Sequence, residues 1–552
     1  MTTFRTRSLV LLLLFGAALF LRVRGLGEVG LSEDEANKIL AVESYRRGDF
    51  SPNAEHPMFM KLLCTGSVIL AERANHMFQT AITPEAALRF PVAVAGAAVT
   101  PAVYLLGIEL LNPPAAMMAA ALWAFDINAV ALTRIAKEDA LVALFFVLGS
   151  AFLLRGKRLH FQEPAGAMRN YIACGASFGL LFASKYLIPI GWLPLIYYDL
   201  FRFRNEPRWR ISRSASIKIY GAFVLILFLC NPILLSPGTW SHAWEHLIHK
   251  RLTHTGYLMM GDIEFNKAFY TFWGTPAYYY PLYLAVKTPL PLLILLVTGL
   301  AYTLRRYRDD RFLFLGLYFV LWLFLLTLPG GKFTRYAVTL LPAVVLLQAL
   351  GMYMLYAGAR SHFEKRGWPQ GASVALLAVL VLGTAGWYVV LDFRNHPFYS
   401  LYVSEQGGGS SRRGFYFPQD DFYDAGLREA VREVCRSAPG GTEVFGATPA
   451  AFQYYQHVFG RADLQFHSTA DPELLLEPGR KPFILYQDYR AYFENYYLLT
   501  FFHGMLRPQH TVLVQGIPSV TVYRLCRDAS CARSPFWNGK HWPDRLASLS
   551  GS

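Results

Sequence analysis

The stretch Leu31-Ser32-Glu33-Asp34-Glu35-Ala36-Asn37 places three carboxylates in a row directly after the first apolar segment of the chain. That segment, 8–24, is long enough to cross a bilayer, so the carboxylates should lie close to a membrane surface. Charged groups so near hydrocarbon are costly unless they face water, a cavity or a partner. The stretch therefore predicts a membrane-embedded fold with a polar site at one membrane face.

The composition supports a polytopic α-helical membrane protein. Of 552 residues, 54% are hydrophobic and only 16% are charged, whereas soluble domains carry about 25% charged residues. The net charge of +14 would suit a nucleic-acid partner, but the basic residues lie in short loops between apolar runs. That distribution is typical of loops that orient membrane helices and not of a surface that binds nucleic-acid phosphates, so no nucleic-acid partner is expected.

The apolar runs predict about eleven spanning helices, together with a first helix that is retained because no small-residue cleavage site follows it. The candidates are 8–24, 86–110, 115–132, 139–155, 170–184, 186–202, 215–235, 289–304, 312–328, 336–357 and 372–391. Basic clusters occur at 157–169, 202–213, 305–311 and 360–366. They lie on the same side of the membrane as Arg5 and Arg7 only if segment 57–80 does not cross the membrane. We therefore expect 57–80 to be an amphipathic surface helix, the N-terminus to be cytoplasmic and the C-terminus to be outside the cell membrane.

This topology gathers the remaining polar features on the outer face. The expected outer loops of the membrane domain, 1–392, are 25–85, 133–138, 236–288 and 329–335. Polar side chains without a common function would divide between the two membrane faces. The convergence of these polar features on one face predicts an active site on the outer side.

After about Asp392 the composition changes to that of a small α/β domain, expected to be extracytoplasmic and to span 393–552. Residues 407–411 are typical of a flexible loop. Helical periodicity follows at 423–436 and 450–458, and strand patterns at 442–446, 482–486 and 511–525.

Each candidate side chain also has an ordinary structural interpretation. Ser32 followed by acids is typical of a helix N-terminus, in which the dipole favours carboxylates; otherwise a carboxylate there can act as a base. Arg134 and Asp139, between two spans, could cap the helix ends or pair with each other, or Arg134 could bind a phosphate through its planar fork. For His56, Lys61 and Lys185 structural roles compete with anion binding or support of a site.

The loop 236–287 holds four histidines, the last of which is His254, interleaved with aromatic residues. We do not expect these histidines to form a complete metal site, and neither a metal nor another cofactor is expected. Aromatic residues and histidines are ordinary at a membrane interface, and they would also suit a loop that covers a sugar and a lipid phosphate.

Taken in order, these pieces resemble the GT-C superfamily of membrane glycosyltransferases, and within it the protein O-mannosyltransferases and bacterial aminoarabinose transferases. The resemblance rests on an ordered set of short motifs over residues 8–390. They are Asp34-Glu35, the His56-to-Lys61 element, Arg134 with Asp139, Ser184-Lys185-Tyr186, Arg335-Tyr336 and the tyrosine-rich stretch 278–289.

The resemblance implies an inverting transferase that takes a sugar, with mannose favoured, from a polyprenyl- or dolichyl-phosphate donor. Asp34 would deprotonate the acceptor with Glu35 in support, and Arg134, Lys185 and Arg335 would hold the donor phosphate. His56, Lys61, Asp139 and His254 would support the sugar or the acceptor, which is protein Ser/Thr or a glycan.

Two departures bear on the acceptor: Met58 replaces the second proline of the family's His-Pro-Pro element, and the C-terminal part is not a β-trefoil. Transfer to a lipid or glycan is therefore the alternative within this class. A transporter or flippase, or a non-catalytic sensor, is the alternative outside it; a transporter predicts midplane charges and related halves, neither of which the sequence has.

Overall fold

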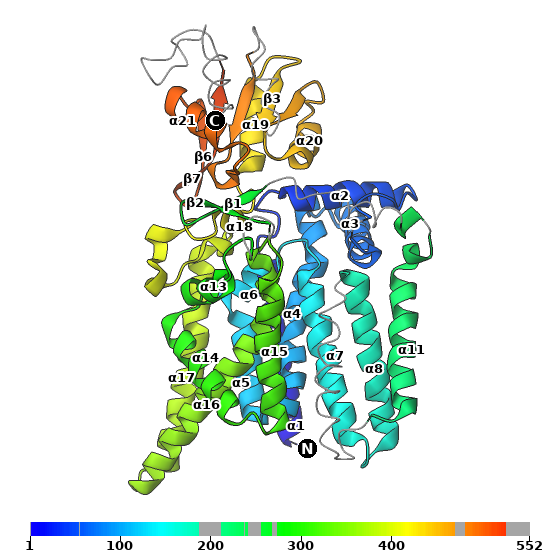
Figure 1. The fold of residues 1–552 in the computed structure, drawn as a ribbon, viewed down its shortest axis with the longest axis vertical. Coiled ribbons are helices and arrows are strands. Elements are labelled where there is room, and N and C mark those ends of the chain that lie inside the picture. Colours follow the sequence, from blue (N-terminus) through cyan, green and yellow to red (C-terminus); the bar gives the residue numbers. More distant parts are fainter. Residues whose placement is uncertain are drawn as a thin grey trace.

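The computed structural model describes residues 2–54, 56–186, 211–236, 238–240, 255–267, 273–469 and 481–525. The described chain is mainly helical and forms a multi-pass bundle with a small mixed sheet at one end (Figure 1). The long bundle helices are α1 (Thr2–Val23), α4 (Pro84–Leu110), α5 (Pro113–Phe125), α7 (Asp139–Leu159), α8 (Pro164–Ser184), α11 (Arg213–Cys230), α14 (Leu290–Arg305), α15 (Asp310–Thr327), α16 (Leu341–Lys365) and α17 (Gln370–Asn395).

In the described residues, seven helices are long and apolar enough to cross a membrane, and α5 and α14 are shorter apolar helices. The predicted number of about eleven therefore remains a prediction, and the candidate 186–202 lies outside the described residues apart from its first residue. Helices α14 and α16 approach closely, because a Cβ atom at Gly299 or Gly351 would collide with the backbone of the partner helix. Small residues of this kind are what bring membrane helices together.

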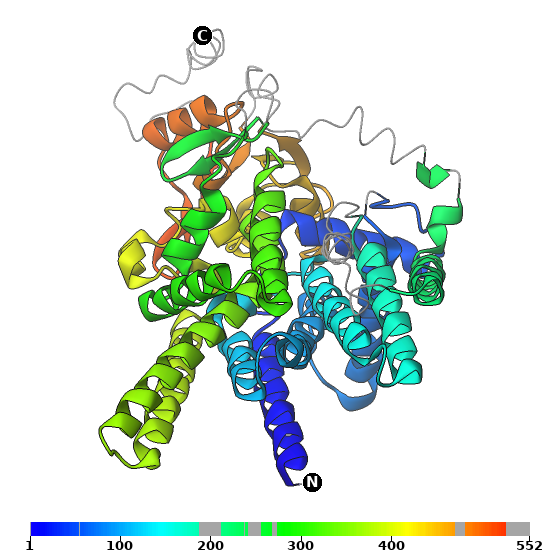
Figure 2. The ribbon, with the colours of Figure 1, turned by 60° about the horizontal axis from the view of Figure 1, so that its bottom comes forward.

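The N-terminus and the sheet lie at opposite ends of the bundle, as the predicted topology requires (Figure 1). At the sheet end lie α2 (Glu33–Arg46) and α3 (Met58–Phe78), which contact each other and do not run parallel to the bundle helices. Helix α3 covers the segment 57–80 that the charge pattern assigned to a membrane surface. At the other end, the α16–α17 pair projects beyond the remaining helices in Figure 1, and in Figure 2 both this pair and α1 project from the bundle.

Local signals divide two of the elements expected to be continuous. The expected helix 115–132 breaks at Asp126, whose side chain accepts a hydrogen bond of 2.8 Å from the backbone of Ala129 and starts the short helix α6 (Ile127–Leu132). The expected strand 511–525 is a hairpin of β6 (His510–Val514) and β7 (Ile517–Arg524), because Gln515 and Gly516 both have positive φ. That pair of angles is typical of a tight hairpin turn.

The mixed sheet has the order β4-β3-β5-β7-β6. Strands β3 (Glu443–Gly446), β4 (Gln465–Ser468) and β5 (Phe483–Tyr486) run parallel, and β5, β7 and β6 pair antiparallel. Helix α19 (Leu427–Ser437) contacts β5, β6 and β7, α20 (Pro449–Val458) packs beside β4, and α21 (Tyr496–Met505) packs its apolar side chains against Phe445, Ile484 and Tyr523. Both sheet faces are thereby covered, which explains why β5 is apolar throughout.

Shorter elements join the bundle to this sheet. They are the hairpin β1 (Gly256–Met259) and β2 (Asp262–Phe265), α13 (Tyr279–Lys287), α18 (Pro418–Phe422) and the 3-10 turns Pro232–Leu235, Thr334–Thr339, Tyr399–Leu401, Glu405–Gly407, Gly409–Arg412 and Asp488–Arg490. The segment 407–411, expected to be a loop, thus carries two of these turns. The predicted helix 423–436 begins instead at Leu427, after the αL residues Tyr423 and Asp424.

Candidate active site

The acidic stretch begins α2 with a reciprocal capping box. The Ser32 Oγ accepts from the Glu35 backbone, and the Glu35 carboxylate accepts from the Ser32 backbone at 3.1 Å. Such a box satisfies backbone N–H groups that have no partner within the helix. The structural interpretation of Ser32 as an N-cap is therefore confirmed, and it accounts for Glu35 as well.

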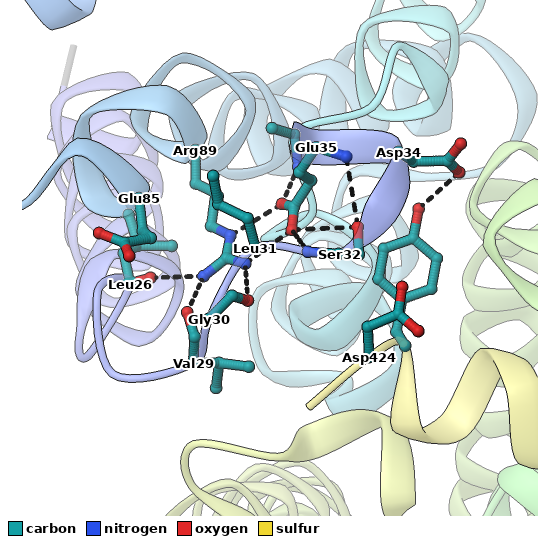
Figure 3. Close-up of polar contacts among 12 residues, drawn as sticks. Leu26, Val29, Gly30, Leu31, Ser32, Asp34, Glu35, Glu85, Arg89 and Asp424 are labelled. Carbon is teal, nitrogen blue, oxygen red and sulfur yellow. Dashed lines mark hydrogen bonds and ion pairs between the residues drawn. The ribbon is translucent and has the colours of Figure 1, made fainter. Parts of the chain in front are cut away.

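Glu35 is buried in a network that holds this part of the chain in place (Figure 3). Arg89 on α4 donates to both Glu35 oxygens, at 2.8 and 2.6 Å, and the backbone of Ala136 donates to Glu35 Oε1 at 2.8 Å. Arg89 also donates to the carbonyls of Leu26, Val29 and Gly30. Both Glu35 oxygens are engaged, so Glu35 holds the start of α2 in place, and its expected support of Asp34 stays a prediction of that positioning kind.

Asp34 points away from this network, and 38% of its side chain is exposed. Its Oδ2 lies 3.2 Å from Lys137 Nζ and 3.5 Å from Arg335 Nη2, and it accepts a hydrogen bond of 3.0 Å from the Tyr423 hydroxyl. Burial alone would raise the pKa of the Asp34 carboxyl, but Lys137, Arg335 and Tyr423 together bring it well below its ordinary value. Asp34 is therefore a carboxylate at neutral pH.

A second carboxylate, Asp139, lies beside the cations that surround Asp34. Lys185 Nζ donates to Asp139 Oδ1 at 2.6 Å, and Arg335 Nε lies 4.0 Å from Asp139 Oδ2. Burial alone would lower the pKa of Lys185, but Asp139 raises it above its ordinary value. Lys137, Lys185 and Arg335 therefore alternate with Asp34 and Asp139, and the group of five carries one positive charge in excess. This excess is suited to holding an anion.

Of the predicted phosphate ligands, Lys185 and Arg335 lie in this cluster and Arg134 does not. Arg134 is buried and donates to the backbone carbonyls of Leu21, Arg22 and Arg24 at the end of α1. Its guanidinium also lies 4.8 Å from the centre of the Tyr399 ring. Burial lowers the pKa of Arg134 to about 10, so it stays charged and caps the helix end. We therefore assign it a structural role instead of the expected phosphate contact.

The residues expected to support the site have mixed positions. Asp139 lies within the cluster, at the first position of α7. Lys61 is buried and donates to the carbonyls of Pro52 and Asn53, so it anchors the loop before α3 and does not snorkel. His56 is close enough to the buried Lys38–Glu138 ion pair to help lower the pKa of Glu138. His254 lies outside the described residues.

Two residues that contact Asp34 were not predicted. Lys137 lies inside the 134–139 stretch, and a tight turn, in which its backbone donates to Ile135 at 2.6 Å, presents it next to Asp34. In the same stretch the sequence drew attention to Arg134, whose planar fork fits phosphate oxygens. Tyr423 is 389 residues away from Asp34 in sequence and has no local signal.

A cavity of about 410 Å³ opens in front of Asp34. This volume lies within the range of about 300–1,000 Å³ that small-molecule sites occupy. Its walls come from α2, from the hairpin β1–β2, from the 3-10 turn that carries Arg335 and from the C-terminal sheet. The lining residues are Glu33, Asp34, Asn37, Tyr257, Asn266, Phe333, Arg335, Gln419, Asp420, Tyr423, Ala447, Pro449, Ser468, Arg490 and Tyr492.

Metal ligands do not gather at this cavity: within the described parts of the chain, no three His, Cys, Asp or Glu side chains lie close enough together to hold an ion. The expectation that the protein needs no metal or other cofactor stays a prediction.

Residues 76–235 match the family model described as dolichyl-phosphate-mannose-protein mannosyltransferase. The chain resembles the GT-C membrane glycosyltransferases. The matched part is less than a third of the chain and contains Lys137, Asp139 and Lys185, but neither Asp34 nor Arg335. No curated protein sequence matches the chain.

Several solved structures are similar to the chain at low identity. ArnT from Cupriavidus metallidurans bound to undecaprenyl phosphate is 14% identical, with a TM-score of 0.48 over 93% of this chain and 97% of its own. The Archaeoglobus fulgidus oligosaccharyltransferase tethered with an acceptor peptide is 12% identical, with a TM-score of 0.48 over 93% and 74%. The S. cerevisiae protein O-mannosyltransferase complex bound to the sugar donor is 18% identical, with a TM-score of 0.33 over 46% and 38%.

Proposed function

We propose that the protein transfers a sugar from a polyprenyl-phosphate donor to an acceptor hydroxyl, with inversion at the anomeric carbon. The observation that carries the proposal is an exposed carboxylate, Asp34, placed next to a cation cluster with one excess positive charge at the wall of a ligand-sized cavity. The mannosyltransferase family match favours mannose as the sugar and protein Ser/Thr as the acceptor. We place the reaction at the extracytoplasmic face of the cell membrane, the side to which the loop charges assign α2.

In the proposed step the acceptor oxygen attacks the anomeric carbon while its proton passes to the Asp34 carboxylate. The bond between the anomeric carbon and the phosphate oxygen breaks, and its electron pair leaves with the lipid phosphate. Lys137, Lys185 and Arg335 would hold the donor phosphate and stabilise the negative charge that grows on it as it leaves. One base is sufficient for this reaction because a neutralised lipid phosphate is a good leaving group.

The proposal is tested with purified protein and polyprenyl-phosphate mannose labelled in the lipid. Release of free lipid phosphate is followed with a Ser/Thr peptide, with a glycan and with a lipid as separate acceptors. Release that depends on the peptide supports the proposal, and release that depends on the glycan or lipid moves the protein to the alternative acceptor class. If the intact donor instead crosses the vesicle membrane without bond cleavage, the protein is a flippase and not a glycosyltransferase.

Removing one cation should weaken donor binding. We expect Lys137→Met to raise the KM for the donor about 10- to 100-fold, because a hydrogen bond to a charged group contributes about 1.5–3 kcal/mol. Asp34 keeps Arg335 and Tyr423 as partners in this variant. The matched control is Arg46→Met, which removes an exposed cation from the far end of α2. An unchanged donor KM for Lys137→Met would contradict the phosphate role of the cluster.

The pH dependence should differ between free and donor-bound protein. In the free protein Lys137 and Arg335 keep the pKa of Asp34 low, so kcat/KM should not fall until the pH is below the ordinary Asp range of about 4. A bound donor phosphate draws on the same cations and so raises the pKa of Asp34. The acidic limb of kcat should therefore lie at higher pH than that of kcat/KM. Profiles measured on both parameters check this, and coincident limbs would contradict it.

A further inference from the structure

The C-terminal sheet turns one particular edge toward Asp34. Strands β4, β3 and β5 are parallel, so their carboxyl ends lie along the same edge of the sheet. Ala447 follows β3, Ser468 ends β4 and Arg490 comes shortly after β5, and all three line the cavity that contains Asp34. The cavity therefore lies where the carboxyl ends of the parallel strands meet the membrane bundle.

The order of these strands marks the position at which open α/β sheets bind ligands. The chain passes from β3 through α20 to β4 on one side, and then returns to place β5 on the other side of β3. The crevice between the carboxyl ends of β3 and β5 is thus a topological switch point, the usual ligand position in such sheets. Here the bundle faces that crevice with the side chain of Asp34.

The sheet is fixed against the bundle by the residue before Asp34. Glu33 accepts hydrogen bonds of 3.0 Å from the backbones of Ala450 and Ala451, at the start of α20. Its own backbone donates to Asp424 Oδ2 at 2.9 Å, and Asp424 also accepts from Arg490 at 2.5 Å through both of its oxygens. The helix end at the switch point, a common position for an anion, is thereby occupied by a carboxylate of the bundle.

The described lining on the sheet side of the cavity offers little to an anionic group. Its cation, Arg490, is engaged by Asp424, whereas Arg335 belongs to the bundle's cation cluster that is assigned to the donor. The rest of this lining consists of rings, Ala447 and uncharged polar side chains, apart from Asp420, which already accepts from the Tyr279 hydroxyl and the Thr334 backbone. The side-chain oxygen of Gln419, which lines the same cavity, is buried and accepts no hydrogen bond from the described residues. It is suited to accepting a bond from a hydroxyl or amide of a ligand.

We propose that the crevice between the carboxyl ends of β3 and β5 is the acceptor subsite, and that it takes an uncharged peptide segment whose hydroxyl reaches Asp34. This inference rests on the proposed glycosyl transfer. It assigns the two substrates to two parts of the chain: the cation cluster of the bundle holds the donor phosphate, and the sheet selects the acceptor. Ala447 lies between β3 and α20 at the cavity wall, so a larger side chain there would narrow the crevice.

The test narrows the crevice without touching the cluster. In the full-length protein, Ala447→Leu is compared with Ala462→Leu, which adds the same side chain at an exposed position of the same sheet region that does not line the cavity. Two readouts are taken: binding of a fluorescent Ser/Thr peptide in the absence of donor, and the KM values for peptide and donor during transfer. Thermal denaturation in detergent identifies a variant that has simply lost its fold.

We expect Ala447→Leu to raise the peptide Kd and the peptide KM at least tenfold, to leave the donor KM unchanged, and to denature at the wild-type temperature. Peptide binding equal to that of wild type would overturn the acceptor subsite, and so would transfer to a phosphate-bearing acceptor in preference to the peptide. If wild type binds the peptide in the crevice but releases no lipid phosphate, the glycosyl-transfer proposal fails and the peptide site stands. If Ala447→Leu releases lipid phosphate with the peptide as fast as wild type, the glycosyl-transfer proposal stands and the peptide site fails.

Discussion

The Asp34→Asn variant is expected to transfer sugar about 10²- to 10⁴-fold more slowly than wild type, the usual contribution of a general base. Asn has nearly the same size as Asp and can still accept the hydrogen bond from Tyr423. What it lacks is the negative charge that receives the acceptor proton. The loss should therefore appear in kcat.

Donor binding should respond differently. In wild type the Asp34 carboxylate lies 3.2 Å from Lys137 and 3.5 Å from Arg335, where it competes for the cations that a phosphate would use. Without that charge the donor KM should stay the same or fall. A fall in kcat together with an unchanged or lower donor KM is characteristic of a group that acts in the transition state.

The measurement is release of lipid phosphate under single-turnover conditions, which isolates the chemical step. Glu43→Gln is the matched control, because it makes the same chemical change on an exposed position of the same helix. Equal turnover by Asp34→Asn and wild type would remove Asp34 as the base. A large rise in donor KM with unchanged kcat would instead assign it a role in binding.

The second large effect is expected on stability, at Glu35. The free energy of unfolding of the Glu35→Leu variant should be lower by about 3–5 kcal/mol, the usual result of leaving one partner of a buried ion pair without the other. Arg89 and Glu35 are both buried and make two hydrogen bonds to each other, so Arg89 would keep its charge without its counter-charge. Burial alone would raise the pKa of Glu35, but Arg89 lowers it below its ordinary value, so the pair is ionised at neutral pH.

Thermal denaturation of the detergent-solubilised protein checks this. The control is Glu364→Ala, which breaks the exposed Arg360–Glu364 pair and should leave the denaturation temperature unchanged. The double variant Glu35→Leu/Arg89→Leu should recover much of the loss, since it leaves no unpaired charge. If Glu35→Leu is inactive but as stable as wild type, Glu35 has a chemical role and not the positioning role assigned to it.

Much of the architecture follows from local patterns. Apolar runs of spanning length, and caps such as Ser32, depend only on neighbours in sequence, so the helical bundle, helix α3 and the start of α2 could be predicted. Breaks that depend on a single side chain, such as the one at Asp126, were missed because the apolar pattern continues through them. The turn at Gln515-Gly516 was missed because a strand-like pattern resumes directly after it.

The candidate site divides in the same way. The sequence indicated that Asp34, Asp139, Lys185 and Arg335 belong to one face, since charge in the loops orients membrane helices. It proposed Arg134 for the donor phosphate, because the planar fork of Arg fits phosphate oxygens, and made no prediction for Lys137. In the tertiary structure the carbonyl groups at the end of α1 accept hydrogen bonds from Arg134, and a turn brings Lys137 to Asp34.

The sequence by itself thus determined that this is a membrane-spanning bundle with an acidic stretch and candidate cations gathered at one face. The resemblance proposed Asp34 as the base and Glu35 as its support, but the sequence could not say which partners the three carboxylates meet. Glu35 faces Arg89, Glu33 faces the start of α20, and Asp34 faces the cavity. Those partners come from segments 54 to 418 residues away, and which of three adjacent side chains meets which partner is decided only when the helices and the sheet pack together.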